Sequence, residues 1–251
     1  MASPLLQLQG VSKSFGGLAA VSDVSLALPA GQLSALIGPN GAGKTTLFAL
    51  MSGFIPPDAG RVVFDGADIT GQPPHLNARR GMTRTFQIVQ PFAAQTVREN
   101  IAVGAHLHCA SRGAALQQAE QVAQQVGLGP QLDKPAGELT VAGRKRLELA
   151  RALATQPRLL LLDEVLAGLN PQEVADMVPV VRAIAAGGVT VLMIEHVMQA
   201  VMHLAAHVWV LAQGKLIAQG SPVEVTRDPQ VIEAYLGHGT AQRLGRMGVA
   251  G

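Results

Sequence analysis

The hydrophobic pattern divides the chain into short apolar runs, which predict strands, and longer periodic runs, which predict helices. Largely apolar runs at residues 33–37, 159–162 and 189–194 are typical of strands buried on both faces of a parallel sheet. Residues 5–11 and 21–28 instead alternate roughly between apolar and polar, which predicts strands with one exposed face. The pattern therefore indicates an α/β protein that begins with its alternating strands.

Helical periodicity fills most of the sequence between these strands, and one block of it interrupts the alternation. From Thr96 to about Gly137 the pattern is helical, and Thr96 followed by Glu99 is typical of a capping box. This block predicts a separate small helical lobe. Further helices are predicted for residues 47–51, 74–80, 144–155 and 171–186, and a hairpin for residues 207–211 and 215–218.

Composition and charge exclude several classes of protein. The chain has 251 residues, of which 48% are hydrophobic, so it can bury a sizeable core. A formal net charge of +2 gives no electrostatic footprint for nucleic acid, which we do not expect as a partner. Mean hydropathy is positive, at +0.28, but no apolar run reaches the roughly 18 residues that a membrane span needs. The first ten residues lack the basic and apolar segments of a signal peptide.

The cysteine content limits which disulfide and metal sites the chain can form. Cys109 is the single cysteine, so no disulfide can form within the chain, which is typical of a reducing compartment. His106 and His108 lie close to it in sequence, but without a second cysteine a zinc site is not favoured there.

The most specific motif is the segment Gly38–Thr46, which reads GPNGAGKTT and fills every fixed position of the G-x-x-x-x-G-K-[ST] pattern. It joins a buried strand to a helix, so backbone N–H groups and a helix N-terminus converge on one anion. Gly38 and Gly43 permit close approach of the backbone to phosphate. Lys44 is expected to reach the β- and γ-phosphates, and the Thr45 hydroxyl to ligate Mg²⁺. The expected phosphate contacts are Gly38, Asn40, Gly41, Ala42, Gly43, Lys44, Thr45 and Thr46.

Polar residues at strand ends supply candidate catalytic chemistry. Asp163 and Glu164 follow the apolar run 159–162 at its carboxyl end, where open α/β sheets place their ligands. Asp163 is expected to hold Mg²⁺ through water, and Glu164 to polarise an attacking water. His196 lies at the end of a later strand and can hydrogen-bond a γ-phosphate. Gln87 can donate and accept, which suits a contact with Mg²⁺ or water.

Two further segments are candidates for contact with a nucleotide. Phe15 stands among small residues, and its aromatic face can stack on a base; the alternative is an ordinary core phenylalanine. Leu139–Gly143 is a small-residue turn that leads into a helix, which makes it a second possible anion site. The cationic run Arg144–Arg146 could also serve phosphates, or could be a solvated helix face.

Taken together, these elements resemble the nucleotide-binding subunit of ABC transporters over nearly the whole chain. The order of the segments carries the resemblance: Gly38–Thr46, Gln87, Leu139–Gly143, Leu159–Glu164, Leu169–Pro171 and His196. It implies an α/β fold with a P-loop NTPase (RecA-like) core, an N-terminal antiparallel β subdomain and an inserted helical subdomain. The whole chain is then one ATP-binding domain, with the core at about 1–90 and 156–236, the helical subdomain at about 91–155 and a C-terminal tail at 237–251.

A closer resemblance is to the ATPase subunits of branched-chain amino-acid importers, on the segments Lys13–Leu18, Arg84–Gln87, Ala167–Pro171 and Ala234–Gly237. It implies hydrolysis of ATP with Mg²⁺ in a pair of ATPase subunits that sandwich two ATP molecules. Two transmembrane permease subunits and a periplasmic solute-binding protein are the other implied partners. The implied location is peripheral, on the cytoplasmic side of the bacterial inner membrane. The solute stays open, as does the choice between a second copy of this chain and a sister subunit.

The resemblance also implies that each phosphate loop faces the partner's signature turn, so Thr140, Ala142 and Gly143 would contact the partner's ATP. Three departures from the family's pattern concern this turn and its neighbours. In the turn, Ala142 replaces a glycine and Gly143 replaces a glutamine; Val165 stands where proline is usual; and Asn170 replaces aspartate, as in the importer subfamily. A methyl group at position 142 would crowd the approach to the γ-phosphate if φ there is positive.

Three alternative functions share parts of this pattern. Lipopolysaccharide-exporter ATPases share most core motifs, but Arg84–Gln87 and Ala167–Pro171 favour the importer. A soluble ABC ATPase of translation or DNA repair is disfavoured, because the chain has neither a second cassette nor a long coiled-coil insertion. The altered signature turn keeps a weakly catalytic, nucleotide-gated regulatory module as a further alternative. For an importer, the segment Gln87–Phe92 with the adjacent helical lobe is the predicted permease contact.

Overall fold

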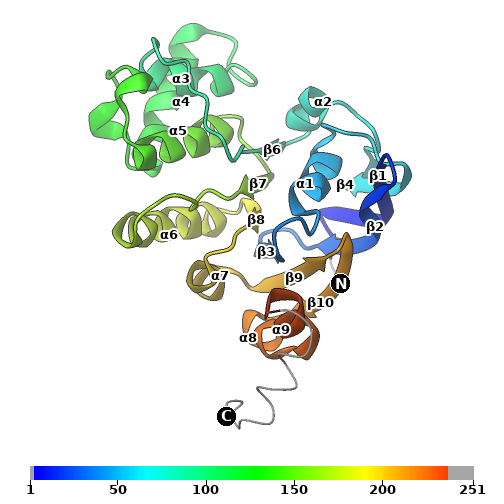
Figure 1. The fold of residues 1–251 in the computed structure, drawn as a ribbon. Coiled ribbons are helices and arrows are strands. Elements are labelled where there is room, and N and C mark those ends of the chain that lie inside the picture. Colours follow the sequence, from blue (N-terminus) through cyan, green and yellow to red (C-terminus); the bar gives the residue numbers. More distant parts are fainter. Residues whose placement is uncertain (1–2, 237–251) are drawn as a thin grey trace.

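The computed structural model describes residues 3–236, and within them the strands form two sheets (Figure 1). The first sheet is antiparallel and has the strand order β2-β1-β4-β5. Its strands are β1 (Leu6–Phe15), β2 (Leu18–Leu28), β4 (Ala59–Phe64) and β5 (Ala67–Asp68). The tail predicted for residues 237–251 lies outside the described residues.

The first two strands run further than the alternating pattern predicts. β1 and β2 stay paired as far as Phe15 with Leu18, and Gly16, with a φ of +57°, lies in the turn between them. Register shifts after Leu8 disturb the alternation of inward and outward side chains. Hydrophobic alternation therefore stops short of the turn although the backbone pairing continues.

The second sheet has the strand order β10-β9-β3-β8-β7-β6. Its neighbouring strands are parallel, except β9 and β10, which form the predicted hairpin. Its strands are β3 (Leu33–Ile37), β6 (Met82–Arg84), β7 (Leu159–Asp163), β8 (Thr190–Ile194), β9 (His207–Ala212) and β10 (Lys215–Gly220).

Every residue of β3, β7 and β8 is buried, which confirms the three predicted buried strands. Their side chains alternate between two apolar clusters, one on each face of the sheet. In β7, Leu160 and Leu162 belong to one cluster, whereas Leu159 and Leu161 belong to the other. Because successive side chains of a strand point to opposite faces, an unbroken apolar run supplies both clusters.

Helices follow the strands of this sheet. α1 (Lys44–Ser52) follows β3, α6 (Pro171–Ala186) follows β7, and α7 (Met198–Leu204) follows β8. The remaining helices of the core are α2 (Pro74–Arg79), α8 (Pro222–Arg227) and α9 (Pro229–Leu236). Between residues 3 and 236, none of the helices combines the length and the apolar character that crossing a membrane requires.

A group of helices between β6 and β7 stands apart from the sheets, as the green part of Figure 1 shows. It is the inserted helical lobe that the sequence predicts, although its boundaries at about 91 and 155 stay a prediction. Thr96 and Glu99 form the predicted capping box at its first helix. Its elements are α3 (Val97–Ala105), α4 (Arg112–Gln125), two 3-10 turns (Gly129–Gln131 and Ala136–Glu138) and α5 (Val141–Leu153).

The start of α5 differs from the prediction, since the helix begins at Val141 rather than at Arg144. Thr140 is its N-cap, and the Thr140 hydroxyl accepts a hydrogen bond from the N–H of Gly143 at 3.1 Å. A capping hydroxyl offsets the low helix propensity of glycine in the first turn. The predicted turn Leu139–Gly143 is therefore largely the first turn of this helix.

We expect the packing of the helical lobe to depend on Ile101 in α3, which is fully buried. Replacing Ile101 with Ala should lower the free energy of unfolding by about 2–5 kcal/mol, because a cavity remains where the side chain packed. Val103→Ala, at a position of α3 that is 48% exposed, should change it by less than about 0.5 kcal/mol. Urea denaturation measures both, and equal effects of the two substitutions would contradict the packing described.

Candidate functional site

A cavity of about 1410 Å³ opens along the phosphate loop, Gly38–Thr46. Its wall also includes Phe15, Gln87, Glu164 and His196, which come from four separate parts of the chain. The structure therefore brings the predicted catalytic residues to the predicted phosphate site. Asp163 is buried and is not among the residues that line this cavity.

The backbone of the phosphate loop requires glycine at two positions. Gly38 has a φ of +153°, and a Cβ there would lie 2.0 Å from the carbonyl oxygen of Leu211. Gly43 has a φ of +101°, and its Cβ would lie 2.3 Å from the carbonyl oxygen of Ala20. Any side chain at either position would push the loop off β9 or β2. The two glycines thus set how closely the loop packs on the sheets behind it.

Lys44 lies at the centre of the loop. Its ammonium group donates to the carbonyl oxygens of Gly38, at 2.7 Å, and Pro39, at 3.0 Å. Burial lowers the pKa of Lys44, while the charges of Glu164 and Asp163 oppose that shift. A partly desolvated cation among backbone donors is well placed to meet the oxygens of a polyphosphate.

Glu164, Gln87 and His196 meet at one end of the cavity. The side-chain amide of Gln87 donates to Glu164 Oε2 at 2.7 Å, and Nδ1 of His196 lies 4.0 Å from Glu164 Oε1. Glu164 has a φ of +49°, a left-handed conformation that four other non-glycine residues of the described chain also adopt. The N–H of Glu164 donates to the carbonyl of Ile194, which holds this turn against β8.

Asp163 is 2% exposed and forms a buried ion pair. Nη2 of Arg84 donates to Asp163 Oδ2 at 2.6 Å, whereas Asp163 Oδ1 is buried and has no hydrogen-bond partner. A free carboxylate oxygen of this kind is the hard ligand that Mg²⁺ prefers. The donor set predicted for the metal also includes Thr45 and Gln87, both at the cavity wall. The residues present therefore fit a magnesium ion bound with a phosphate.

Arg84 lies under aromatic rings on the other side of this ion pair. Its guanidinium carbon lies 5.8 Å from the ring centre of Phe48, 5.9 Å from that of Phe54 and 5.5 Å from that of Phe86. Aromatic faces attract a cation and exclude water from it. The sequence pointed to Arg84 only through the resemblance of the segment Arg84–Gln87, and no pattern predicted that it would pair with Asp163.

Phe15 is 50% exposed and lines the cavity, so the alternative of a core phenylalanine is wrong. The ammonium of Lys13 lies 5.8 Å from the centre of its ring. An exposed ring at the rim of a phosphate site is available for stacking with a base, which is the role predicted for it.

The signature turn lies away from this cavity. Thr140, Ala142 and Gly143 form the start of α5 in the helical lobe, and none of them lines the cavity. Ala142 is helical, and among the described residues it is not one of those with positive φ. The condition under which its methyl group would strain the backbone is therefore not met.

The interpretation of Arg144–Arg146 as either a phosphate contact or a solvated face is wrong for Lys145. Lys145 is 7% exposed, and its ammonium donates to the carbonyl oxygens of Gln87, at 3.2 Å, and Glu164, at 3.0 Å. The reason is the helical period: α5 turns this one position of the cationic run toward the core. Arg144 is exposed and donates to the carbonyl of Gly137.

Tyr235 is a cavity residue that sequence reasoning missed. It lies in α9, lines the cavity and forms a hydrogen bond with the backbone of Gly38. Burial raises the pKa of the Tyr235 phenol, and the bond to Gly38 opposes the shift. In the sequence, the segment Ala234–Gly237 indicates only a subfamily resemblance. No periodic pattern predicts that the last helix lies beside the phosphate loop.

Glu195 is a second buried carboxyl next to the catalytic group. It is 1% exposed, and Glu195 Oε1 accepts a hydrogen bond from the N–H of Leu166 at 2.9 Å. Burial raises the pKa of Glu195 to about 7. The carboxyl therefore titrates near neutral pH, beside His196 and behind the Glu164 turn.

The segment around Cys109 shows no zinc geometry. The thiol of Cys109 donates to the side chain of Gln118 at 3.1 Å, and His108 contacts the carbonyl of Thr155 at 3.0 Å. In residues 3–236, no group of three or more His, Cys, Asp and Glu side chains could hold a metal ion.

Comparisons with known proteins identify families and relatives that are similar to this chain. A family model described as "ABC transporter" matches residues 21–167, and one described as "Branched-chain amino acid ATP-binding cassette transporter" matches residues 215–241. The chain is 40% identical, over 253 residues, to the high-affinity branched-chain amino acid transport ATP-binding protein of Pseudomonas aeruginosa. That match covers 94% of this chain and 99% of the relative. The lipopolysaccharide export system ATP-binding protein of Acidithiobacillus ferridurans is 35% identical over 235 residues, covering 94% of this chain and 98% of that protein.

Solved structures give the same result for the fold. The chain resembles a nucleotide-free ATP-binding cassette from an ABC transporter, with a TM-score of 0.85 and 32% identity. It resembles an ABC transporter cassette in its ADP conformation with a TM-score of 0.86 and 33% identity. Each match covers 94% of this chain and 100% of the other.

We expect Glu195 to make stability depend on pH. Its pKa is about 7 in the folded protein, against an ordinary 4.5, so as pH rises through this window the unfolded chain loses its proton first. As pH rises through this window, the loss of this group's contribution should lower the free energy of unfolding by about 3 kcal/mol. Glu195→Gln should be more stable than the parent at pH 8 and differ little at pH 4.5.

Urea denaturation at several pH values tests this expectation. Glu138→Gln is the control, because Glu138 is exposed and its neutralisation should leave the pH profile unchanged. If Glu195→Gln and the parent keep the same difference in stability at every pH, the carboxyl does not titrate as described.

Proposed function

Because the chain belongs to the ABC transporter family, we propose that it is the ATP-binding subunit of a solute importer. It binds ATP with Mg²⁺ and hydrolyses it to ADP and phosphate. Hydrolysis drives uptake of a small solute, of the branched-chain or related amino-acid class, through partner permease subunits. The contact of Gln87 with Glu164 beside the phosphate loop is the observation that carries this proposal.

The proposed roles follow from the geometry of the cavity. Lys44 and the loop amides hold the phosphates, and His196 donates to the γ-phosphate. Thr45, Gln87 and Asp163 hold Mg²⁺, whose charge stabilises the phosphate oxygens during transfer. Phe15 stacks on the base of the nucleotide.

Glu164 orients the attacking water and accepts its proton. Its Oε2 is held by Gln87, so Oε1, on the side of His196, is the oxygen available for the water. Phosphoryl transfer needs little covalent help, so positioning and charge stabilisation supply most of the rate enhancement.

The proposed assembly has two ATPase subunits and two permease subunits. The signature turn at the start of α5 lies outside the chain's own cavity, which supports a role at the nucleotide of a second ATPase subunit. Helix α5 is long enough to present N–H groups and a positive end to that nucleotide. The subunit is then peripheral, on the cytoplasmic face of the membrane, with a solute-binding protein acting on the far side.

The class of solute is proposed from the comparisons. The match of residues 215–241 and the 40% identity to a branched-chain amino acid transport protein support an importer of this type. The lipopolysaccharide exporter subunit is less similar, at 35% identity. A purely regulatory module is disfavoured, because Gln87 and His196 lie beside Glu164 at the phosphate loop, as the proposed hydrolytic roles require.

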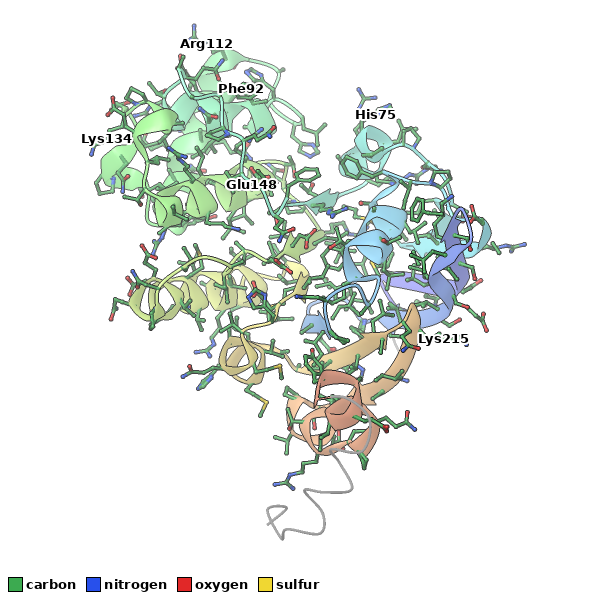
Figure 2. The ribbon with its side chains drawn as sticks, in the orientation of Figure 1. His75, Phe92, Arg112, Lys134, Glu148 and Lys215 are labelled. Atoms are coloured by element: carbon green, nitrogen blue, oxygen red, sulfur yellow. The ribbon has the colours of Figure 1, made fainter. Side chains whose placement is uncertain are left out.

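Exposed apolar side chains support the predicted permease contact. In the segment Gln87–Phe92, Ile88 is 74% exposed and Phe92, labelled in Figure 2, is 48% exposed. Phe86 just before it packs edge to face on Phe54, with ring centres 5.3 Å apart. Apolar side chains gathered at one surface are typical of an interface.

We expect Glu164→Gln to bind Mg-ATP normally and to lower turnover by at least about 100-fold, because the amide cannot accept the proton of the attacking water. ATPase assays on the assembled transporter, with titration of a fluorescent ATP analogue, measure the two quantities. Asp176→Asn, an exposed position in α6, is the control. Turnover at the parental rate would refute the role of Glu164.

We expect a cysteine at position 88 to crosslink to a permease subunit in the assembled transporter, because Ile88 is strongly exposed within the proposed contact. The substitution is made in a Cys109→Ser background, so that Ile88→Cys supplies the single thiol. Val223→Cys, at a 48% exposed position in α8, is the matched control. Crosslinks from position 223 and none from position 88 would place the permease elsewhere.

A further inference from the structure

Lys145 occupies an unusual position for a lysine. Its side chain is buried between α5 and the catalytic end of the sheet, and its ammonium joins two main-chain segments. It donates to the carbonyl of Gln87 at 3.2 Å and to the carbonyl of Glu164 at 3.0 Å. These are the two residues whose side chains are hydrogen-bonded to each other at 2.7 Å. One cation therefore fixes the backbones of both members of the catalytic pair.

The surroundings of Lys145 show how a buried cation is tolerated there. Burial lowers the pKa of Lys145, and the negative charge of Glu195 is the first that opposes this, followed by Glu164, Asp163 and Glu148. Glu148 lies one helical turn further along α5 and is labelled in Figure 2. A buried charge with two carbonyl acceptors and several carboxylates nearby is strongly held, since moving it would leave the charges unpaired.

The Glu164 turn needs such a restraint. Glu164 has the left-handed φ of +49°, and its own N–H is held by the carbonyl of Ile194. Val165 follows it, so the turn lacks the rigidity that a proline ring would add. Without Lys145, the carbonyl side of Glu164 would lose its contact with the helical lobe. The direction of the Glu164 side chain depends on both sides of this turn.

Resting on the proposed function, we propose that Lys145 is a positioning residue for ATP hydrolysis. Its ammonium holds the backbones of Gln87 and Glu164 so that their side chains stay paired at the attacking water. Since Lys145 lies on α5, whose first turn is the signature turn, it also makes the catalytic pair follow the position of the helical lobe. It touches neither nucleotide nor water and acts through Glu164.

The test compares three substitutions in the purified transporter complex. Lys145→Met keeps the length of the side chain but removes the donors, so kcat should fall by roughly tenfold or more, while the affinity for a fluorescent ATP analogue should stay within about twofold. Lys145→Arg keeps donors for both carbonyls and should recover most of the parental kcat. Lys134→Met, an exposed position of the lobe that is labelled in Figure 2, is the control and should match the parent.

A second measurement separates positioning from a merely structural role. In the Glu164→Gln background, Lys145→Met should lower the residual turnover by much less than tenfold, because most of its effect passes through the Glu164 carboxylate that is already lost. A parental kcat for Lys145→Met, or a fall in the Glu164→Gln background as large as in the parent, would overturn the proposal. So would a loss of kcat accompanied by an equal loss of nucleotide affinity. If the parent complex itself hydrolyses no ATP, the proposed function fails instead.

Discussion

The site depends on the register of three parallel strands. Leu36 in β3 pairs with Ile194 in β8, and Ile194 also pairs with Asp163 in β7, so these three residues form one row across the sheet. The phosphate loop begins just beyond this row at the end of β3. Glu164 directly follows the row in β7, and Glu195 and His196 follow it in β8. Because parallel strands all end at the same edge, the anion-binding loop, the acids and the histidine must converge there. A shift of one residue between these strands would move each side chain to the opposite face of the sheet and separate the loop from Glu164.

Buried charges attach the remaining parts to this edge. Arg84, at the end of β6, pairs with Asp163 under a cover of aromatic rings, and Lys145 joins the helical lobe to Glu164. Such groups contribute less to net stability than apolar side chains of the same size would, since removing charges from water is costly. They fix the orientation of the groups they bind: one oxygen of Asp163 is occupied by Arg84, and the other is left without a hydrogen-bond partner. The chain thus uses polar contacts where the positions of individual atoms matter and apolar packing elsewhere.

Much of this arrangement could be predicted from the residues in order. The phosphate loop, the apolar runs that form β3, β7 and β8, and the capping box at Thr96 are local patterns, and the structure contains all of them. The contacts that sequence reasoning missed are all between distant segments. Tyr235 meets Gly38, Arg84 meets Asp163, and Lys145 meets Gln87 across the gap between lobe and core. No period or spacing in one segment contains the information about which distant segment it will pack against.

By itself, then, the sequence determined the chemistry of each local element: glycines that let a backbone approach phosphate, an acid pair after a buried strand, and strands that fill both faces of one sheet. These follow from forces that act within a few residues, namely backbone sterics, capping and hydrophobic periodicity. The tertiary structure alone decided that Lys145 would donate to Gln87 and Glu164, and that Asp163 would be held by Arg84. A buried charge needs a polar partner, and which distant group supplies that partner is decided only when the segments pack together and exclude water.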